Sequence, residues 1–372
     1  MFEFKPDWED SARRIEAFWE REVLDRPVVQ FALTRPIDEQ VALPPSGHAT
    51  LRDRWMDVAY QAESAVARMR NQEFLGDTLP VAMPNLGPEI LAACYGCPLQ
   101  FGDTTSWTEP ILKDWADADQ IQFQPDNPYL ARLHALTDAY LELGRDKFIT
   151  GMTDWHPGGD LLASLRDPAN LAMDLITNPD DVLAFLQRTE ADYRAIYDVF
   201  YSKLRAAGQP ISTWLTLASE GRYYVPSNDF SYMISNAMFQ LFFLPGLTRE
   251  CQFLDRSIYH LDGPGALRHL DSLLAIPELD AVQWVFGAGN EGYSRWVEVY
   301  RRVQAAHKGI VVNCRLEEID QVIETLSPRG LCLHVEGVRS HETGIALLRR
   351  LERWCRGAQW QGADLPAQGQ GI

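Results

Sequence analysis

The sequence predicts an α/β protein built as a closed (β/α)8 TIM barrel with an N-terminal helical cap. From residue 147 onward, short apolar runs typical of strands alternate with amphipathic segments typical of helices, and the connections are short. This pattern requires parallel strands covered by helices. The strand candidates number close to eight, which favours a closed barrel over an open sheet. No Gly-x-Gly-x-x-Gly or Gly-Lys-Ser/Thr loop follows a strand, which disfavours dinucleotide-binding and P-loop folds.

The chain divides into three predicted parts. Residues 1–75 form an N-terminal helical segment with the first strand, packed on the barrel. Its helices are expected at 11–23 and 52–70, on either side of an apolar strand at 27–33. Residues 76–357 form the barrel body. Residues 358–372, rich in Gln and Gly, read as a flexible tail.

Within the barrel body, period-two and period-3.6 apolar patterns predict the elements in order. Strands are predicted at residues 79–83, 148–153, 211–217, 257–260, 281–286, 309–313 and 330–335. Helices are predicted at residues 89–95, 130–143, 181–204, 247–254, 267–274, 293–307, 316–326 and 341–356. Residues 106–112 are expected to be extended.

Composition excludes several classes of protein. The chain has 372 residues, 46% of them hydrophobic, which is enough for a sizeable core. Its net charge is 34 − 52 = −18, and such a surface repels nucleic acid and anionic lipid. Its six cysteines are sparse and mostly lie in apolar runs, which indicates buried thiols in a reducing compartment. With no signal peptide pattern or span of ~20 apolar residues, we expect a cytoplasmic protein.

The strongest candidate site follows the strand at 257–260. His260 and Asp262 lie two residues apart, so their side chains point the same way with Cα atoms roughly 7 Å apart. A glycine-rich loop follows at once, and in a parallel barrel such loops lie on the functional face. We therefore expect both residues to be catalytic. Asp154 and His156, which follow the strand at 148–153, are the second catalytic candidates; the competing interpretation is a turn network.

The same residues suggest a metal site. Histidine, cysteine and carboxylate are the ligands that Zn²⁺ uses, and three protein ligands leave a position open for substrate. His260 and Asp262 would supply two ligands, and the last strand would supply the third from Cys332 or Glu336, which we leave as alternatives. The competing interpretation makes Cys332 a buried core thiol. Further polar and aromatic residues after strands are expected to line a substrate cavity: Asn85, Glu109, Trp155, Tyr223, Tyr224, Asp229 and Trp284.

Several motifs resemble the uroporphyrinogen decarboxylase superfamily. They are Ile-Tyr-His-Leu-Asp-Gly-Pro-Gly-Ala-Leu from residue 258, Asp-Ala-Val-Gln-Trp-Val-Phe-Gly-Ala-Gly from 280, Leu-Ser-Pro-Arg-Gly-Leu from 326 and Asn-Leu-Gly-Pro-Glu-Ile-Leu-Ala-Ala from 85. The resemblance covers residues 25–356 approximately. It implies a (β/α)8 barrel with its active site at the C-terminal mouth. It also implies either porphyrinogen decarboxylation or zinc-dependent methyl exchange with corrinoid proteins or thiols.

The chain departs from both branches of that superfamily. Residues 34–38 read Thr-Arg-Pro-Ile-Asp, where the decarboxylases carry an arginine-rich loop of the type Arg-Gln-Ala-Gly-Arg, and this disfavours decarboxylation. The methyltransferases use His-x-Cys plus a later Cys. Here His260 matches the histidine, and Asp262 stands at the position of the first cysteine. A carboxylate is a harder ligand than a thiolate and admits a different metal.

Three functional hypotheses follow. The first is a metal-assisted methyltransferase that acts on a small molecule, with zinc as the expected metal and a small corrinoid protein as the expected partner. The second is a metal-free decarboxylase or lyase that uses His260 and Asp262 as an acid/base pair. The third is a non-catalytic barrel that binds a small ligand. A homodimer is a further expectation, whereas nucleic acid and membrane are not expected partners.

Overall fold

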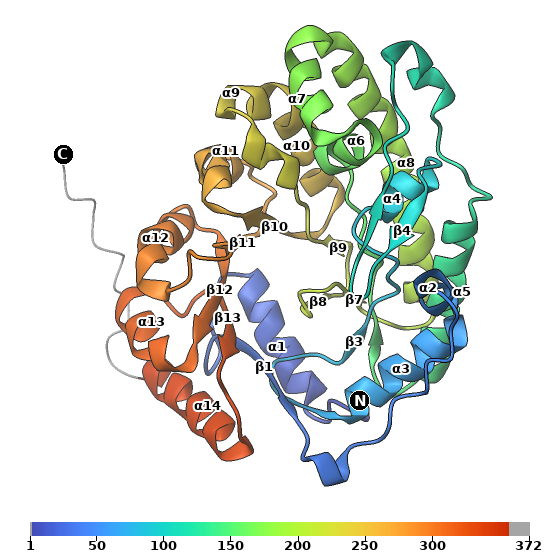
Figure 1. Cartoon of the computed structure of the whole chain (residues 1–372). Coiled ribbons are helices and arrows are strands. Elements are labelled where there is room, and N and C mark those ends of the chain that lie inside the picture. Colours follow the sequence, from blue (N-terminus) through green and yellow to red (C-terminus); the bar gives the residue numbers. More distant parts are fainter. Residues whose placement is uncertain (1, 357–372) are drawn as a thin grey trace, which may run out of the picture.

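A seven-stranded, mostly parallel sheet forms the centre of the protein. The computed structural model describes residues 2–356. The strands follow the order β2-β1-β13-β12-β11-β10-β9, and only β2 runs antiparallel to its neighbour. Their bounds are β1 (Val28–Thr34), β2 (Gln72–Gly76), β9 (Tyr223–Tyr224), β10 (Arg256–Asp262), β11 (Ala281–Val285), β12 (Gly309–Arg315) and β13 (Leu331–Glu336). Helices lie on the outer side of these strands (Figure 1).

The remaining strands are short and pair separately. They are β3 (Val81–Ala82) with β6 (Ile149–Thr150), β4 (Leu99–Phe101) with β5 (Ser106–Thr108), and β7 (Ile211–Ser212) with β8 (Ala218–Ser219). Gly151 N donates to Ala82 O over 2.8 Å and so extends the β3–β6 pair, and Met152 N, just after β6, donates to Ser212 O of β7 over 2.7 Å and so links that pair to the next. The predicted mixed α/β fold is confirmed and is compatible with a barrel. Between residues 2 and 356 the strand ladders do not close into one cylinder, because β3, β6 and β7 have only two residues each.

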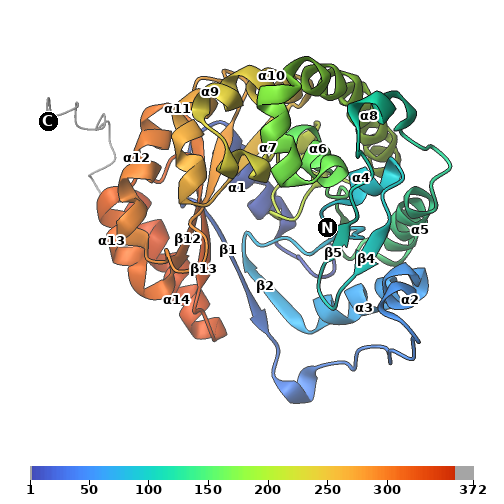
Figure 2. The ribbon, with the colours of Figure 1, turned by 45° about the horizontal axis from the view of Figure 1, so that its top comes forward.

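Fourteen α-helices surround the strands among the described residues (Figures 1 and 2). The first seven are α1 (Trp8–Trp19), α2 (Leu51–Met56), α3 (Val58–Arg70), α4 (Ile90–Cys94), α5 (Pro128–Leu143), α6 (Gly158–Arg166) and α7 (Pro168–Thr177). The others are α8 (Pro179–Ala206), α9 (Asn236–Met238), α10 (Leu244–Phe253), α11 (Leu270–Leu274), α12 (Val297–Ala305), α13 (Ile319–Thr325) and α14 (His341–Arg356). A 3₁₀ helix, η3 (Asp229–Met233), and a π-helix, η4 (Phe239–Phe243), precede α10.

Helix α1 covers the amino-terminal ends of the strands. The indole Nε1 of Trp19 donates to Ala218 O over 2.9 Å, and its ring meets the Tyr223 ring at 5.1 Å in an edge-on arrangement. At the start of β12, a Cβ added to Gly309 would lie 3.2 Å from the Phe18 ring, so the helix packs closely there. With that end covered, the carboxyl ends of the parallel strands are the end at which a site can open.

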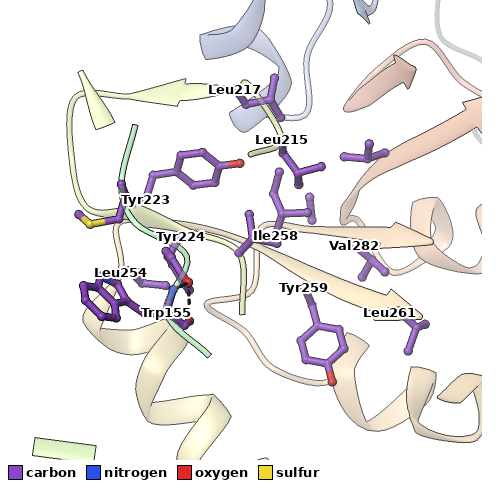
Figure 3. Close-up of a cluster of buried hydrophobic side chains, with 14 of the residues drawn as sticks. Trp155, Leu215, Leu217, Tyr223, Tyr224, Leu254, Ile258, Tyr259, Leu261 and Val282 are labelled. Carbon is purple, nitrogen blue, oxygen red and sulfur yellow. Dashed lines mark hydrogen bonds between the residues drawn. The ribbon is translucent and has the colours of Figure 1, made fainter. Parts of the chain in front are cut away.

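Side chains along β10 alternate between two faces of the sheet, one packed in the hydrophobic core and the other partly exposed. Tyr259 and Leu261 are about 1% exposed and lie in the aromatic and aliphatic core that Figure 3 shows around Trp155 and Tyr224. His260 and Asp262 point to the opposite face and stay partly exposed. The tail predicted for residues 358–372 lies outside the described residues. No helix between residues 2 and 356 has the length and apolar character needed to cross a membrane.

Candidate metal centre

The inner face of the sheet carries an unusual number of polar side chains. In-register partners in a parallel sheet face the same side. His260 pairs with Gln283, Val311 with Cys332, and His334 with both Asn313 and Gln30. The polar residues on this face are therefore Gln30, His260, Asp262, Gln283, Asn313, Cys332 and His334. Buried polar side chains cost free energy, so a face with only a packing role would carry apolar residues. The polar residues on this face therefore indicate a functional site.

Three of the described residues offer metal-ligating atoms that lie within 4.8 Å of one another: Asp229, His260 and Asp262. His260 and Asp262 come from β10, and Asp229 begins η3. The loop before Asp229 is brought alongside the strand by a bridge between Ser227 and His260, and by His260 N, which donates to Pro226 O over 2.9 Å. One imidazole and two carboxylates are thus gathered at the carboxyl end of a parallel strand.

A buried glutamine orients the imidazole. His260 Nδ1 lies 2.7 Å from Oε1 of Gln283, which is 4% exposed, and the edge of Trp214 packs on the ring at 5.2 Å. Because the amide oxygen accepts, Nδ1 carries the proton and Nε2 keeps its lone pair for a metal.

Replacing Gln283 with leucine is expected to lower metal affinity about 10–100-fold without unfolding the protein, because the imidazole loses its orienting partner. Chelator competition with purified protein measures the change. Gln304→Leu is the matched control, since that buried glutamine bonds Ser327 instead of a ligand. Equal metal affinities in the two variants would rule out a positioning role for Gln283.

The carboxyl group of Asp229, the third residue of the cluster, is tuned by its surroundings. Burial of the carboxyl group and the nearby Asp160 carboxylate raise the pKa of Asp229 to about 6, against the lowering effect of His260 and His156. The residue as a whole is still exposed, so its carboxyl group sits at the boundary of the site. A bound cation would favour its ionised form. The donor set of one nitrogen and two oxygens suits Zn²⁺ or a harder divalent ion.

A second cluster lies beside the first and centres on His156. Its Nε2 is 2.9 Å from Asp154 Oδ2, and its Nδ1 is 2.8 Å from Ser227 Oγ. Ser227 in turn donates to Asp160 Oδ2 over 3.0 Å. Tyr224 donates to Asp154 Oδ1 over 3.2 Å. Asp160 is thus shared between the network of His156 and the surroundings of Asp229.

Two carboxylates hold His156 in its charged form. Burial alone would lower the pKa of His156, but Asp154 and Asp160 outweigh burial and raise it well above the ordinary value. Burial opposes ionisation of Asp160 as well, yet the hydrogen bond from His156 keeps the pKa of Asp160 low. The imidazolium and the Asp160 carboxylate therefore stabilise each other at neutral pH.

This pairing predicts a pH-dependent loss of stability in His156→Gln. Because the pKa of His156 is raised on folding, its contribution is fully present below its unfolded pKa of about 6.5 and is lost as pH rises through the folded pKa. We expect a loss of roughly 1–3 kcal/mol in urea unfolding between pH 5 and 6.5, shrinking at alkaline pH. His341→Gln, at an exposed ion pair with Glu73, should cost under about 1 kcal/mol at any pH. A constant cost for His156→Gln would contradict the charged form.

Cys332 and Glu336 lie outside the three-residue cluster. Cys332 is fully buried on β13, three strand spacings or roughly 14 Å along the sheet from β10, and its thiol contacts Gln30 Oε1 at 3.8 Å. Burial raises its pKa well above the ordinary value. Glu336 is exposed at the end of β13, in register with Arg315. The position that sequence reasoning gave to one of these two residues is taken in the structure by Asp229.

The other candidates are distributed around the fold. Asp154 and Asp229 lie in or beside the two clusters. Asn85 and Glu109 are exposed and bond Gly87 and Gln100. The aromatic candidates are at most 1% exposed, so their rings belong to the core: Trp155, Tyr223, Tyr224 and Trp284. The sequence analysis did not identify Gln283 or Ser227. Gln283 lies on the strand that follows the His260 strand in the sequence, but only the register between the two strands shows that it is the partner of His260.

Comparison with known proteins supports the fold. No family model matches the chain, and no curated protein matches its sequence. Among solved structures, it is similar to a methyltransferase from Methanosarcina mazei, with a TM-score of 0.53 and 12% sequence identity. The match covers 93% of this chain and 99% of that one. At this identity the likeness is one of fold alone, and the fold is compatible with a barrel-like α/β protein.

Proposed function

We propose that this protein is a metal-assisted methyltransferase acting on a small molecule. The observation that carries the proposal is the convergence of Asp229, His260 and Asp262, whose ligating atoms lie within 4.8 Å of one another at the end of β10. The methyltransferase from Methanosarcina mazei, similar in fold over nearly its whole length, adds support.

The finer architecture belongs to the same proposal. We infer that the parallel strands β1, β3, β6, β7 and β10 to β13 correspond to the eight strands of a (β/α)8 barrel of the uroporphyrinogen decarboxylase type. Their sequence order, the parallel pair of β3 and β6, and the hydrogen bond that Met152 N donates to Ser212 O of β7 support this. The site would then lie at the mouth of the barrel, where such enzymes bind their substrates.

Each residue has a defined task in this reaction. A zinc ion, when bound, lowers the pKa of a thiol or hydroxyl nucleophile. Gln283 holds His260 with Nε2 toward the cluster, and Asp229 and Asp262 supply the negative charge that retains a divalent cation. His156, charged between Asp154 and Asp160, places a positive charge beside the cluster and fixes the Ser227 hydroxyl.

The methyl donor proposed is a corrinoid carried by a small partner protein. A methylated corrinoid would supply the methyl group and would keep the electron pair of its carbon–cobalt bond, while the residues of the cluster would hold the deprotonated nucleophile that takes the methyl carbon. The test is elemental analysis of the purified protein, followed by incubation with methylcobalamin and 2-mercaptoethanol. We expect about one divalent metal per chain and metal-dependent demethylation seen in the visible spectrum. Metal-free protein with full activity would refute the proposal.

A second candidate is a metal-free lyase or decarboxylase in which His260 and Asp262 exchange protons with substrate. The observation in its favour is the pKa of about 6 at Asp229, which sets a carboxyl group beside this pair within reach of neutral pH. The same elemental analysis separates the two, because only the methyltransferase requires the metal.

A further inference from the structure

A large cavity lies apart from the metal centre, among α6, α8, η4 and α10. Its volume is about 870 Å³, within the range of small-molecule sites. Helices α6 and α8 pack together, as do α8 and α10, in the part of the molecule that Figure 1 shows above β9. The apolar residues on its wall include Leu183, Leu186, Phe239, Phe242 and Leu247. Such a surface receives an apolar molecule in preference to water.

The wall also contains buried acceptors that lack well-aligned hydrogen bonds. Glu250 is 8% exposed, its Oε1 has no hydrogen bond of ordinary geometry, and the hydroxyl of Tyr193, also on the wall, is the donor beside it. Asn228 is 7% exposed, and its Oδ1 has none either. A Cβ at Gly159 would lie 2.4 Å from that oxygen, so the glycine makes room for it. Buried acceptors of this kind cost free energy unless a donor reaches them.

The charges around the cavity leave Glu250 without an ion pair. The two arginines on the wall both bind Glu190: Arg194 Nη2 lies 2.6 Å from its Oε1, and Arg249 Nη2 lies 2.8 Å from its Oε2. Burial raises the pKa of Glu250 to about 7, while Tyr193, His156 and Arg194 lower it and Glu190 raises it. A cation that entered the cavity would find one carboxyl group free to ionise against it.

The backbone of the wall is itself unusual. Residues Phe239–Phe243 form a π-helix between α9 and α10, and four of these five line the cavity. A π-helix is rare and is found most often at functional sites, because it places side chains that a regular α-helix could not. The cavity, the unpaired acceptors and the π-helix are three separate observations that converge on one place.

We propose that this cavity binds a small, largely apolar molecule with a primary ammonium group, held by Glu250 and Asn228 while its apolar body packs against α8 and η4. The site is distinct from the metal centre, and the Ser227–Asp229 segment lies between them, with Ser227 and Asn228 on the cavity wall and Asp229 at the metal ligands. The inference stands without the methyltransferase proposal, because none of the three metal ligands lines the cavity.

Isothermal titration calorimetry on the full chain tests it with three probes of matched shape: 4-phenylbutylamine, 4-phenylbutanol and 4-phenylbutyrate. We expect the amine to bind about tenfold to hundredfold more tightly than the alcohol, the range for one hydrogen bond to a charged group. The carboxylate should bind most weakly. Equal affinities for amine and alcohol, no binding of the amine, or tightest binding of the carboxylate would each overturn the proposal.

Variants locate the binding site. Glu250→Gln keeps the size of the side chain and should remove the preference for the amine while leaving the alcohol within about twofold. Glu278→Gln makes the same change at an exposed glutamate outside the cavity and should alter nothing. Asp262→Asn, which weakens the metal centre, should leave amine binding intact. Loss of amine binding in Asp262→Asn but not in Glu250→Gln would place the ligand at the metal centre and overturn the proposal.

Discussion

Replacing His260 with glutamine is expected to lower the affinity of the protein for zinc by more than about 100-fold, beyond the loss typical of an orienting residue. The imidazole Nε2 is the only nitrogen ligand among the three clustered residues, and an amide is a far weaker zinc ligand. Methyl transfer that depends on the metal should fall with it. The measurement is metal content after dialysis, with competition against a chromogenic chelator for the affinity.

His334→Gln is a matched control for that experiment. His334 lies on the same inner face, three strands away on β13, and burial lowers its pKa to about 4, so it is a neutral imidazole like the proposed ligand. Its Nε2 has no hydrogen-bond partner, so it too is free to coordinate. We expect this variant to retain zinc. Zinc lost from His334→Gln and kept by His260→Gln would place the metal centre at β13 instead of β10.

The second half of the fold was readable from the sequence because its strands are long. In β10 to β13, five to seven residues alternate between the two faces, and the apolar positions reveal the period. The apolar runs at 79–83, 148–153 and 211–217 also predicted strands, but in the structure the ladders there, β3, β6 and β7, have only two residues each. The sequence therefore predicts a parallel sheet. It does not predict how the short strands β3, β6 and β7 connect the two edges of that sheet, because they do so through isolated backbone hydrogen bonds.

The site shows a similar division. The shared direction of the His260 and Asp262 side chains follows from their spacing alone, because residues two apart on a strand share a face. The partner from another element does not follow from spacing. Asp229 reaches the pair because Pro226 and Ser227 run beside β10, and this pairing of a loop with a strand has no sequence signature. Cys332 is chemically the better zinc ligand, but it lies three strands away.

The aromatic residues mark a further limit of sequence reasoning. Tyr223 and Tyr224 form the short strand β9 at the start of β10, and both are buried in the core (Figure 3). A pair of tyrosines in a polar segment looks like a substrate clamp when only the sequence is read. Their burial follows from pairing with β10 and from contacts with Trp19 and Tyr197, which are distant in the sequence.

The largest loss of stability is expected from a substitution at Asp77, which lies between β2 and β3 and contacts β1. We call this contact between β1 and the chain around Asp77 the seam. Asp77 is fully buried and accepts hydrogen bonds from Arg26, from Arg14 Nη1 over 3.3 Å and from Val29 N over 3.0 Å. Its own N–H donates to Val29 O over 2.7 Å. One carboxylate thus compensates the buried Arg26 and, just past the end of the β1–β2 ladder, ties β1 to the chain that continues into β3.

Asp77→Asn is therefore expected to reduce the free energy of unfolding by about 3–5 kcal/mol, because it leaves the Arg26 guanidinium, 4% exposed, buried without a counter-ion. Urea denaturation followed by far-UV circular dichroism measures the loss. Asp271→Asn makes the same change at an exposed pair with Arg302 and should cost less than about 1 kcal/mol. If the two variants unfold at the same urea concentration, the buried carboxylate does not hold the seam, and the β1–β2 ladder together with apolar packing holds it instead.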